Sequence, residues 1–422
     1  MQFIYNSIIV ITSLLLKVVA LFNPKLKSFV AGRKTTFKTI RNKIKKEDVV
    51  IWMHCASLGE FEQGRPVLEQ LKKEYPAKKI VLTFFSPSGF EVRKNYELAD
   101  VVCYLPLDSN KNVTKFLKWV HPEAAIFVKY EFWPNYLRQL KKQQISTILI
   151  SGIFRKNQVF FKWYGSWMRN ALKTFHHFFV QDIQSKNLLN SIHLNNVTVS
   201  GDTRFDRVYE ITGQNNTLPF VEAFKNNQML LVAGSTWKDD ELLLVDYINN
   251  HAASNQRFII APHNIHKNEI EALKKAINKP TIVFSEECLN NTYDTQKLKK
   301  ASVFIVDTIG LLTKIYSYAT IAYVGGGFTK SGVHNVLEPA TFGIPILIGP
   351  RFSKFKEVKD LVALKACISV NNSEKLSVNL MKFFQQETLR KQKGKLALDY
   401  VVLKKGATNK IINYFKDERK IR

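Results

Sequence analysis

The sequence predicts an α/β protein of two doubly wound domains, each built on a parallel sheet, preceded by an apolar N-terminal helix. Short β-rich runs alternate with longer helical stretches, which is typical of βαβ units. The pattern stops at a polar break, residues 213–218, and then starts again. A chain of 422 residues is also too long for one ordinary core. We therefore expect two halves of similar size that face a cleft beyond the carboxyl ends of their strands.

Seven strands are expected in each half. The first half contains Val49–Met53, Ile80–Phe85, Val101–Tyr104, Ala125–Lys129, Thr147–Ser151, His177–Val180 and Val197–Ser200, with helices at Glu60–Glu74 and Trp133–Lys142. The second half contains Met229–Ala233, Arg257–Ala261, Thr281–Phe284, Val303–Val306, Ile321–Val324, Pro345–Ile348 and Ala366–Ser369. The predicted domains are an anchor helix at 1–24, then 25–212 and 213–398, followed by a basic helix at 399–422.

The first segment is predicted to associate with a membrane. Residues Phe3 to Phe22 include fifteen apolar residues of twenty, and such a helix spans about 30 Å, the thickness of the hydrocarbon layer. Asn6, Ser13 and Lys17 share one side of the helix, a stripe that also suits a helix lying in the interface. Basic residues come after the segment, which places the rest of the chain in the cytoplasm. Burial within a soluble domain is the remaining alternative.

The composition indicates an anionic partner. The formal charge is +27, so the excess should face nucleic acid, an acidic membrane or phosphorylated substrates. The sequence has no helix-turn-helix, RRM or zinc signature, so nucleic acid is not expected. The cysteines lie far apart in apolar contexts, which indicates buried thiols rather than disulfides or zinc ligands.

A first candidate for chemistry is Glu60, in the motif VVIWMHCASLGEFEQGRP. It follows a strand and a loop, so it should point beyond the carboxyl end of the sheet. A helix N-terminus favours its ionised form, which makes it a proton acceptor of modest strength at neutral pH. The alternative is structural, because Ser57 and Glu60 have the spacing of a capping box.

A second candidate is Glu131, in FVKYEFWPNYL. It follows a strand, and its aromatic neighbours Tyr130, Phe132 and Trp133 should partly desolvate it, a setting that shifts acidities. The alternative is an interior carboxylate paired with Lys129 or another cation.

A third candidate is Arg204, in VSGDTRFDRV. It follows a strand and a turn, and it would hold a developing negative charge on a leaving phosphate or on a substrate carboxylate. The alternative is a turn held together by an ion pair with a flanking aspartate.

The fourth and most specific motif is IAYVGGGFTKSGVHNVLEPATFGIPILIGP. Three glycines follow a strand, and His334 with Asn335 is predicted to open the next helix, where backbone N–H groups favour a phosphate. Glu338 lies one turn further on. It is either a carboxylate that merely interacts favourably with the helix dipole, or an acceptor of hydrogen bonds from ribose hydroxyls. The glycine run is neither a Walker A loop nor G-x-G-x-x-G, and no D-x-D occurs, so no cofactor and no metal are expected.

Five blocks of this sequence resemble one enzyme family. ASLGEFEQGRP, KYEFWPN, SGDTRFD, DTIG and GGGFTKSGVHNVLEPA are similar, in the same order from about Val49 to Pro350, to the 3-deoxy-D-manno-octulosonic acid (Kdo) transferases of lipopolysaccharide synthesis. The resemblance implies the GT-B fold, with two Rossmann-like domains facing a central cleft. It also implies an inverting, metal-independent transfer from CMP-Kdo to a lipid A precursor of the lipid IVA type, at the cytoplasmic face of the inner membrane.

The resemblance also implies roles for single residues. Glu60 is expected to be the general base, with Glu131 and Arg204 stabilising the transition state. The expected CMP contacts are Pro262, His263, Ile309, Gly310, Leu311, Asn335, Val336, Leu337 and Glu338. The sequence departs from the family at His263, where Arg is frequent, and at Leu311, where Glu or another polar residue is frequent. The competing interpretation is another GT-B enzyme, either a lipid-linked transferase that uses a UDP-sugar or a sugar-nucleotide 2-epimerase.

Overall fold

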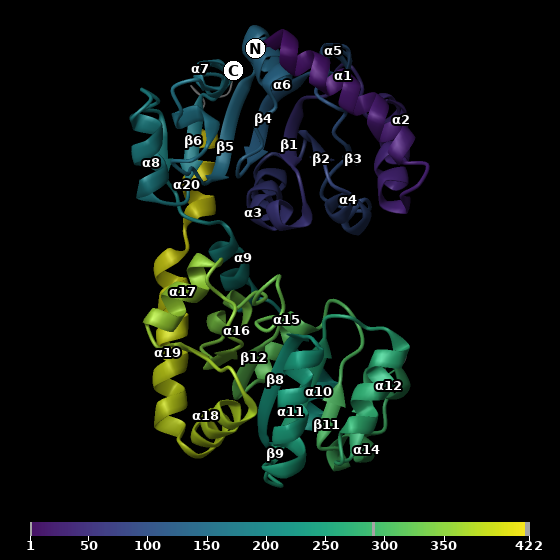
Figure 1. Cartoon of the computed structure of the whole chain (residues 1–422), viewed down its shortest axis with the longest axis vertical. Helices are drawn as coiled ribbons and strands as arrows, with labels where there is room; N and C mark the ends of the chain where they lie inside the picture. The colour runs from purple at the N-terminus through teal and green to yellow at the C-terminus, as the bar shows by residue number, and fades with distance from the viewer. Residues whose placement is uncertain (1, 289–291, 418–422) are drawn as a thin grey trace. The chain divides into compact units, whose positions relative to one another are not determined.

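The computed structural model of the chain describes residues 2–288 and 292–417 (Figure 1). Met1 and residues 418–422, which belong to the predicted end segments, lie outside this range. The chain divides into two units: unit 1 combines the residues up to Arg207 with those from Lys405 onward, and unit 2 is Val208–Lys404. This division lies five residues before the expected one at 212/213.

Unit 1 is built on a parallel sheet of seven strands. These are β1 (Val50–Cys55), β2 (Lys79–Phe84), β3 (Val101–Tyr104), β4 (Pro122–Val128), β5 (Ser146–Gly152), β6 (His177–Val180) and β7 (Val197–Val199). Their order is β3-β2-β1-β4-β5-β6-β7. Nearly every strand residue is buried, because helices cover both faces of the sheet, and this explains the continuous apolar runs in the sequence.

The helices of unit 1 lie on both faces of its sheet. They are α1 (Gln2–Val19), α2 (Pro24–Lys43), α3 (Leu58–Glu74), α4 (Pro87–Arg93), α5 (Asn110–Val120), α6 (Pro134–Lys142), the 3₁₀ turn η1 (Val159–Phe161), α7 (Ser166–Leu172), α8 (Ile183–Asn190) and α20 (Ala407–Lys416). Side chains of α2, α5, α6, α7 and α8 share one core with the sheet. Those of α3 and α20 share the core of the opposite face.

Unit 2 repeats the architecture. Its strands are β8 (Met229–Thr236), β9 (Gln256–Pro262), β10 (Thr281–Val283), β11 (Val303–Ile305), β12 (Ile321–Val324), β13 (Ile346–Ile348) and β14 (Cys367–Ser369). They are parallel, in the order β10-β11-β9-β8-β12-β13-β14. The chain enters this unit through α9 (Arg204–Ile211), which starts in unit 1.

The helices of unit 2 are α10 (Pro219–Lys225), α11 (Lys238–Asn250), α12 (Lys267–Ala276), α13 (Phe284–Glu287), α14 (Thr295–Lys300), α15 (Leu312–Ile315), the 3₁₀ turn η3 (Tyr316–Tyr318), α16 (Leu337–Thr341), α17 (Lys356–Ala363), α18 (Ser373–Gln385) and α19 (Glu387–Lys404). Helices α11, α12 and α18 pack on one face of the sheet, and α10 and α14 pack on the other (Figure 1).

The predicted strands are confirmed: each of the fourteen is present, with ends that differ by at most three residues. The expected α/β class with two parallel sheets is therefore correct. The basic tail differs from the expectation of one helix from Asp399. The tail contains the end of α19 and a second helix, α20, with the left-handed residue Gly406 (φ +108°) between them. Helix α20 belongs to unit 1. Asp206 stabilises the start of α20 by accepting hydrogen bonds from the backbone N–H groups of Gly406 and Thr408.

Candidate functional site

The strand order of each sheet reverses at its centre, and such a switch point is where open parallel sheets bind ligands. In unit 1 the reversal lies between β1 and β4. Glu60 follows β1, and Glu131 follows β4, so two predicted residues flank the switch point. In unit 2 the reversal lies between β8 and β12, and the glycine run follows β12.

Glu60 is buried at the start of α3, with 5 % of its surface exposed. Its Oε2 accepts a hydrogen bond of 2.6 Å from the backbone N–H of Ala56. Ser57 is the N-cap residue, yet its side chain makes no capping bond, and the carboxylate accepts from the residue before the cap, so the predicted capping box does not form as a reciprocal pair. The side chain of Glu60 is therefore held in place by backbone, in a setting with little water.

The acidity of Glu60 differs from the sequence expectation. Burial, reinforced by the charge of Glu131, raises its pKa to about 7, against the opposing effect of backbone N–H groups and Lys129. We expected the helix N-terminus to keep the carboxyl acidic, and that expectation was wrong because desolvation outweighs the dipole. A base with a pKa near the working pH is better matched to proton transfer than an ordinary carboxylate.

Glu131 is largely enclosed, with 12 % of its side chain exposed, and Trp133 is the one of its three aromatic neighbours in the sequence that bonds to it. Its Oε2 accepts a hydrogen bond of 3.0 Å from Trp133 Nε1 and lies 3.4 Å from Nε2 of His54. The Nζ of Lys129 lies instead over the ring of Tyr130, at 5.0 Å from its centroid. The group beside this carboxylate is therefore the imidazole of His54, and the ion pair with Lys129 that the structural alternative named is not formed.

His54 is a fully buried residue that the sequence interpretation did not single out. Its Nδ1 lies 2.9 Å from Thr83 Oγ1, which also accepts a hydrogen bond of 2.8 Å from Trp52 Nε1. Its Nε2 accepts a hydrogen bond of 3.1 Å from Trp133 Nε1. The signal was a histidine inside an apolar strand, where an imidazole needs partners on both nitrogens.

Arg204 forms the ion pair that the structural alternative described. Its Nη2 lies 2.8 Å from Asp202 Oδ2, and its backbone N–H donates to Asp202 Oδ1 at 2.9 Å. The same aspartate accepts a hydrogen bond of 3.2 Å from Gln63 of α3, the helix that carries Glu60. The turn that holds Arg204 is therefore attached to the helix of the first candidate residue, although β7 is at the far edge of the sheet.

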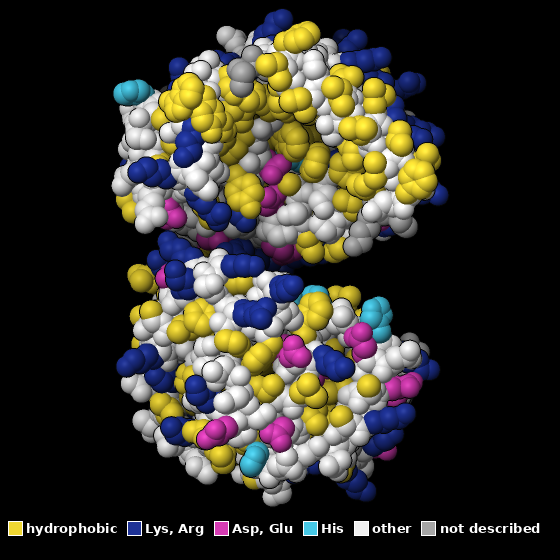
Figure 2. Space-filling model, in the orientation of Figure 1, with side chains coloured by type: hydrophobic (Ala, Val, Ile, Leu, Met, Phe, Trp, Pro, Cys, Tyr) yellow, Lys and Arg dark blue, Asp and Glu magenta, His cyan; other side chains and the backbone are white. Residues whose placement is uncertain are grey.

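The face of unit 1 seen in the upper part of Figure 2 is hollowed. Hydrophobic side chains gather around the hollow, and acidic side chains are visible inside it. A hollow with an apolar rim and a few polar groups inside is typical of a ligand-binding site.

The glycine run of unit 2 serves the packing of its own loop. The N–H of Gly325 donates to Gly234 O, and the N–H of Gly326 donates to Asp240 Oδ2, both at 2.9 Å. A Cβ on Gly325 or Gly327 would lie within 2.6 Å of neighbouring backbone atoms, and Gly326 has φ +89°. Two of the three amides are thus already used, so the expected phosphate contact does not explain these glycines.

The segment from Asn335 to Glu338 also differs in detail from the expectation. Helix α16 begins at Leu337 rather than at His334–Asn335, and it has five residues. Asn335 Nδ2 donates to Glu338 Oε1 at 3.0 Å, and Thr313 Oγ1 donates to Glu338 Oε2 at 3.0 Å. Because Thr313 lies on α15, directly after residues 309–311, these bonds bring two of the predicted CMP segments together. Ile309 is 86 % exposed beside Gly310, whose φ is +97°.

A stack of rings brings the third predicted segment to the same place. The ring of His263 lies 4.6 Å from those of both Trp237 and His334, nearly parallel to each. Trp237 Nε1 donates a hydrogen bond of 3.1 Å to His334 Nε2. Burial, with the charge of His263, lowers the pKa of His334 to about 4, and burial also lowers the pKa of His263. The predicted CMP contacts thus form one cluster in unit 2, joined by Trp237 and His334.

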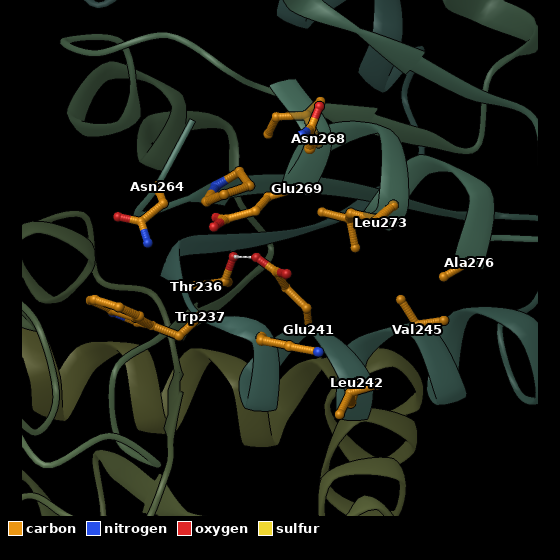
Figure 3. A pocket seen from close by; sticks show the side chains of 14 residues that line it. Thr236, Trp237, Glu241, Leu242, Val245, Asn264, Asn268, Glu269, Leu273 and Ala276 are labelled. Atoms are coloured by element: carbon orange, nitrogen blue, oxygen red, sulfur yellow. Dashed lines mark hydrogen bonds between the residues drawn. The ribbon is translucent and has the colours of Figure 1, made fainter. Parts of the chain in front are cut away.

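A pocket of about 640 Å³ lies beside this cluster, between α11 and α12 (Figure 3). Its lining includes Trp237, Pro262, Glu241 and Glu269 together with apolar side chains such as Leu242 and Leu273. Thr236 Oγ1 donates to Glu241 Oε1 at 2.9 Å, and burial raises the pKa of Glu241. Of the predicted site residues, Pro262 is the one that lines this pocket.

Comparisons with known proteins agree with the resemblance of the motifs. Residues 31–207 match the model of the family 3-deoxy-D-manno-octulosonic-acid transferase (kdotransferase). A 3-deoxy-D-manno-octulosonic acid transferase of Chlamydophila psittaci is 26 % identical over 392 residues, 88 % of each chain. The enzyme of the same name from Aquifex aeolicus is 27 % identical over 337 residues, 78 % of this chain and 84 % of the relative.

The solved structures show the fold. The UDP-GlcNAc 2-epimerase from Neisseria meningitidis bound to UDP-GlcNAc has a TM-score of 0.57 at 15 % identity, over 87 % of this chain and 99 % of that one. At such identity the similarity shows a GT-B-like fold with two Rossmann-like units, and it does not extend to the substrate. From residue 31 to residue 207 the chain carries a Kdo transferase domain, and it is similar to Kdo transferases, which are glycosyltransferases of lipopolysaccharide synthesis, over most of its length.

Proposed function

We propose that this protein transfers Kdo from CMP-Kdo to a lipid A precursor of the lipid IVA type, with inversion, without a metal, and with Glu60 as the general base. The observation that carries the proposal is the position and acidity of Glu60. It is buried beside the switch point of unit 1, and its pKa is raised to about 7 by burial and by the charge of Glu131.

The proposed reaction is a direct displacement. The acceptor hydroxyl gives its proton to the carboxylate of Glu60 while its oxygen forms a bond to the anomeric carbon of Kdo. The bond between that carbon and the phosphate oxygen breaks, and CMP leaves with the electron pair. Glu131 and Arg204 stabilise charge that develops in the transition state, and Asp202 and Trp133 hold these two side chains in position.

Unit 2 binds the donor in this proposal. Pro262, His263, Ile309 to Leu311 and Asn335 to Glu338 contact CMP, and they form one cluster through the ring stack and the Thr313–Glu338 bond. His263 replaces the frequent Arg of the family, so its neutral imidazole would act by stacking and hydrogen bonding rather than by charge. Leu311 precedes α15 as its N-cap residue, where its backbone remains a contact.

The acceptor is a membrane lipid, so we place the enzyme at the cytoplasmic side of the inner membrane. Helix α1 is, within the described residues, the one helix long and apolar enough by length and composition to cross a membrane. The charge of +27 suits an anionic leaflet and an acceptor that carries phosphates.

The test is an incubation of the full chain with CMP-Kdo and a tetraacylated lipid A precursor, with and without EDTA, followed by mass spectrometry of the lipid. We expect the mass of the acceptor to increase by one or more Kdo residues in both conditions. Loss of product with EDTA would contradict metal independence. Equal use of UDP-sugars in a donor screen would favour a UDP-dependent transferase or an epimerase instead.

A further inference from the structure

The N-terminal end of α1 is bonded to the body of unit 1. Tyr5 Oη donates to Asp108 Oδ2 at 2.8 Å, and Asn135 Nδ2 donates to Asn6 Oδ1 at 2.8 Å. Asp108 is 1 % exposed and also accepts hydrogen bonds of 3.0 Å from the backbone N–H groups of Asn135 and Tyr136 at the start of α6. Two polar residues of α1 therefore complete a buried network that also positions α6.

The C-terminal end of α1 is held as well. Ala20, just beyond the helix, is 6 % exposed, and α2 begins four residues later. Helix α2 is fixed to the sheet side of unit 1, because Arg33 donates to the carbonyls of Phe85 and Leu105 at 2.7 and 3.0 Å. From Tyr5 to Ala20 the helix covers about 22 Å at 1.5 Å per residue, so it lies along unit 1 over most of its length.

The outward flank of α1 is apolar and exposed. Its large apolar side chains are between 45 and 83 % exposed: Phe3, Ile4, Ile8, Val10, Ile11, Leu14, Leu15, Val18 and Val19. Two exposed aromatic residues lie near this helix: Trp163 is 90 % exposed and Tyr164 is 51 % exposed. They precede Trp167 by four and three residues, and the centroid of the Trp167 ring lies 5.7 Å from that of Tyr5 on α1. Figure 2 shows yellow side chains gathered on this face of unit 1. Water does not favour such a patch, and exposed Trp and Tyr are typical of membrane interfaces.

We propose that α1 and the Trp163–Tyr164 loop form one membrane-docking surface, and that α1 lies flat in the interface of an anionic bilayer without crossing it. To cross about 30 Å of hydrocarbon, α1 would have to leave unit 1. It would then carry Tyr5 and Asn6 into lipid and leave Asp108 without its Tyr5 partner. Lying flat keeps these bonds and buries the apolar flank.

Charge completes the match to an anionic surface. Lys17 on α1 and Lys27, Lys34 and Lys38 on α2 are exposed, and neither helix contains an acidic residue. Basic side chains beside an interfacial helix attract anionic headgroups. The inference deepens the proposed function, since a flat α1 holds the rim of the unit 1 hollow at the depth of the acceptor headgroup.

The topology can be measured by thiol labelling. All four native cysteines are buried, so an impermeant maleimide reports on a single introduced cysteine. Gln2→Cys marks the start of α1, and Asn190→Cys, exposed at the end of α8, is the matched control. We expect both to react in inverted membrane vesicles and neither in spheroplasts. Reaction of Gln2→Cys in spheroplasts alone would show that α1 crosses the membrane and overturn the proposal.

A second experiment tests the surface itself. The double variant Leu14→Lys/Leu15→Lys should lower binding to vesicles of phosphatidylglycerol and phosphatidylethanolamine by about tenfold or more, because it places charge in the apolar flank. The control Asn190→Lys/Ser191→Lys adds the same charge elsewhere on unit 1 and should not weaken binding. Unchanged binding of the first variant would assign docking to another surface. If vesicle binding follows this pattern but no Kdo reaches a detergent-dispersed acceptor, the proposed function fails and the docking surface stands.

Discussion

The two units share seven parallel strands and a central switch point, but they use that point differently. In unit 1 the switch point carries Glu60, whose raised pKa reflects burial and a neighbouring negative charge. In unit 2 the polar groups at the corresponding edge bond to one another: Asp240 accepts from Trp237, Gly326 and Tyr323, and Asn335 bonds Glu338. Burial raises the pKa of a carboxyl in both places, since the pKa of Asp240 is raised too. The difference lies in the neighbours: three donors hold Asp240 inside its loop, whereas the charge of Glu131 reinforces the shift at Glu60.

The sharpest test of this contrast is Glu60→Gln. Gln keeps an acceptor for the Ala56 N–H but cannot take a proton, so turnover should fall roughly a hundredfold or more, the scale of general-base assistance. CMP affinity, which the proposed mechanism assigns to unit 2, should not change. The measurement is kcat on a detergent-dispersed acceptor together with CMP calorimetry. Ser57→Ala is the matched control, and it should keep activity because the Ser57 side chain makes no capping bond. Turnover of Glu60→Gln within a few fold of the parent would make Glu60 a structural residue.

In unit 2, Asn335→Ala and Glu338→Ala should each weaken CMP binding by about 1–3 kcal/mol, the scale of hydrogen bonds to charged groups. Each substitution also removes the Asn335–Glu338 bond that orders the segment. Calorimetry with CMP measures the effect. Asn268→Ala, in the pocket between α11 and α12, is the control. If Asn268→Ala weakens CMP while Asn335→Ala does not, the donor binds in that pocket.

The stability of the protein should depend on pH through Glu60. Its pKa is about 7 in the folded chain against an ordinary 4.5, so between these pH values the folded protein retains a proton that the unfolded chain has lost. The free energy of unfolding therefore falls as the pH rises through this window, by about 1–3 kcal/mol for this group. Glu60→Gln should be more stable than the parent at pH 8, and this gain should vanish at pH 4.5, as urea unfolding would measure. A constant difference at both pH values would contradict the raised pKa.

The smallest expected effect concerns the charge of Glu131. Because that charge raises the pKa of Glu60, Glu131→Gln should move the acid limb of the kcat/KM profile to lower pH, in addition to any loss of rate. Glu123→Gln, in β4 and paired with Lys78 on the surface of the same unit, should leave the profile in place. If the acid limb does not move in Glu131→Gln, the charge of Glu131 does not raise the pKa of Glu60.

Periodicity and motifs predicted much of this protein. The strands at both switch points, the positions of Glu60 and Glu131 after them, and the family all follow from local runs of residues and their order. Local patterns carry this information because burial on both faces of a parallel sheet demands continuous apolar runs. The tertiary partners of these residues were not predictable in the same way. His54 lies beside Glu131, which is 77 positions away in the sequence. Gln63 donates a hydrogen bond to Asp202, which is 139 positions away.

The amino-acid sequence by itself determined the two α/β halves, the apolar first helix and the residue types at the carboxyl ends of the strands. Tertiary structure decided what those residues do to one another. It raised the pKa of Glu60, because desolvation depends on every neighbour and not on the helix start alone. It committed two glycine amides to the loop itself, and it turned Tyr5 and Asn6 toward Asp108 and Asn135. Burial and pairing are properties of packed surfaces, and these surfaces exist only once distant segments meet.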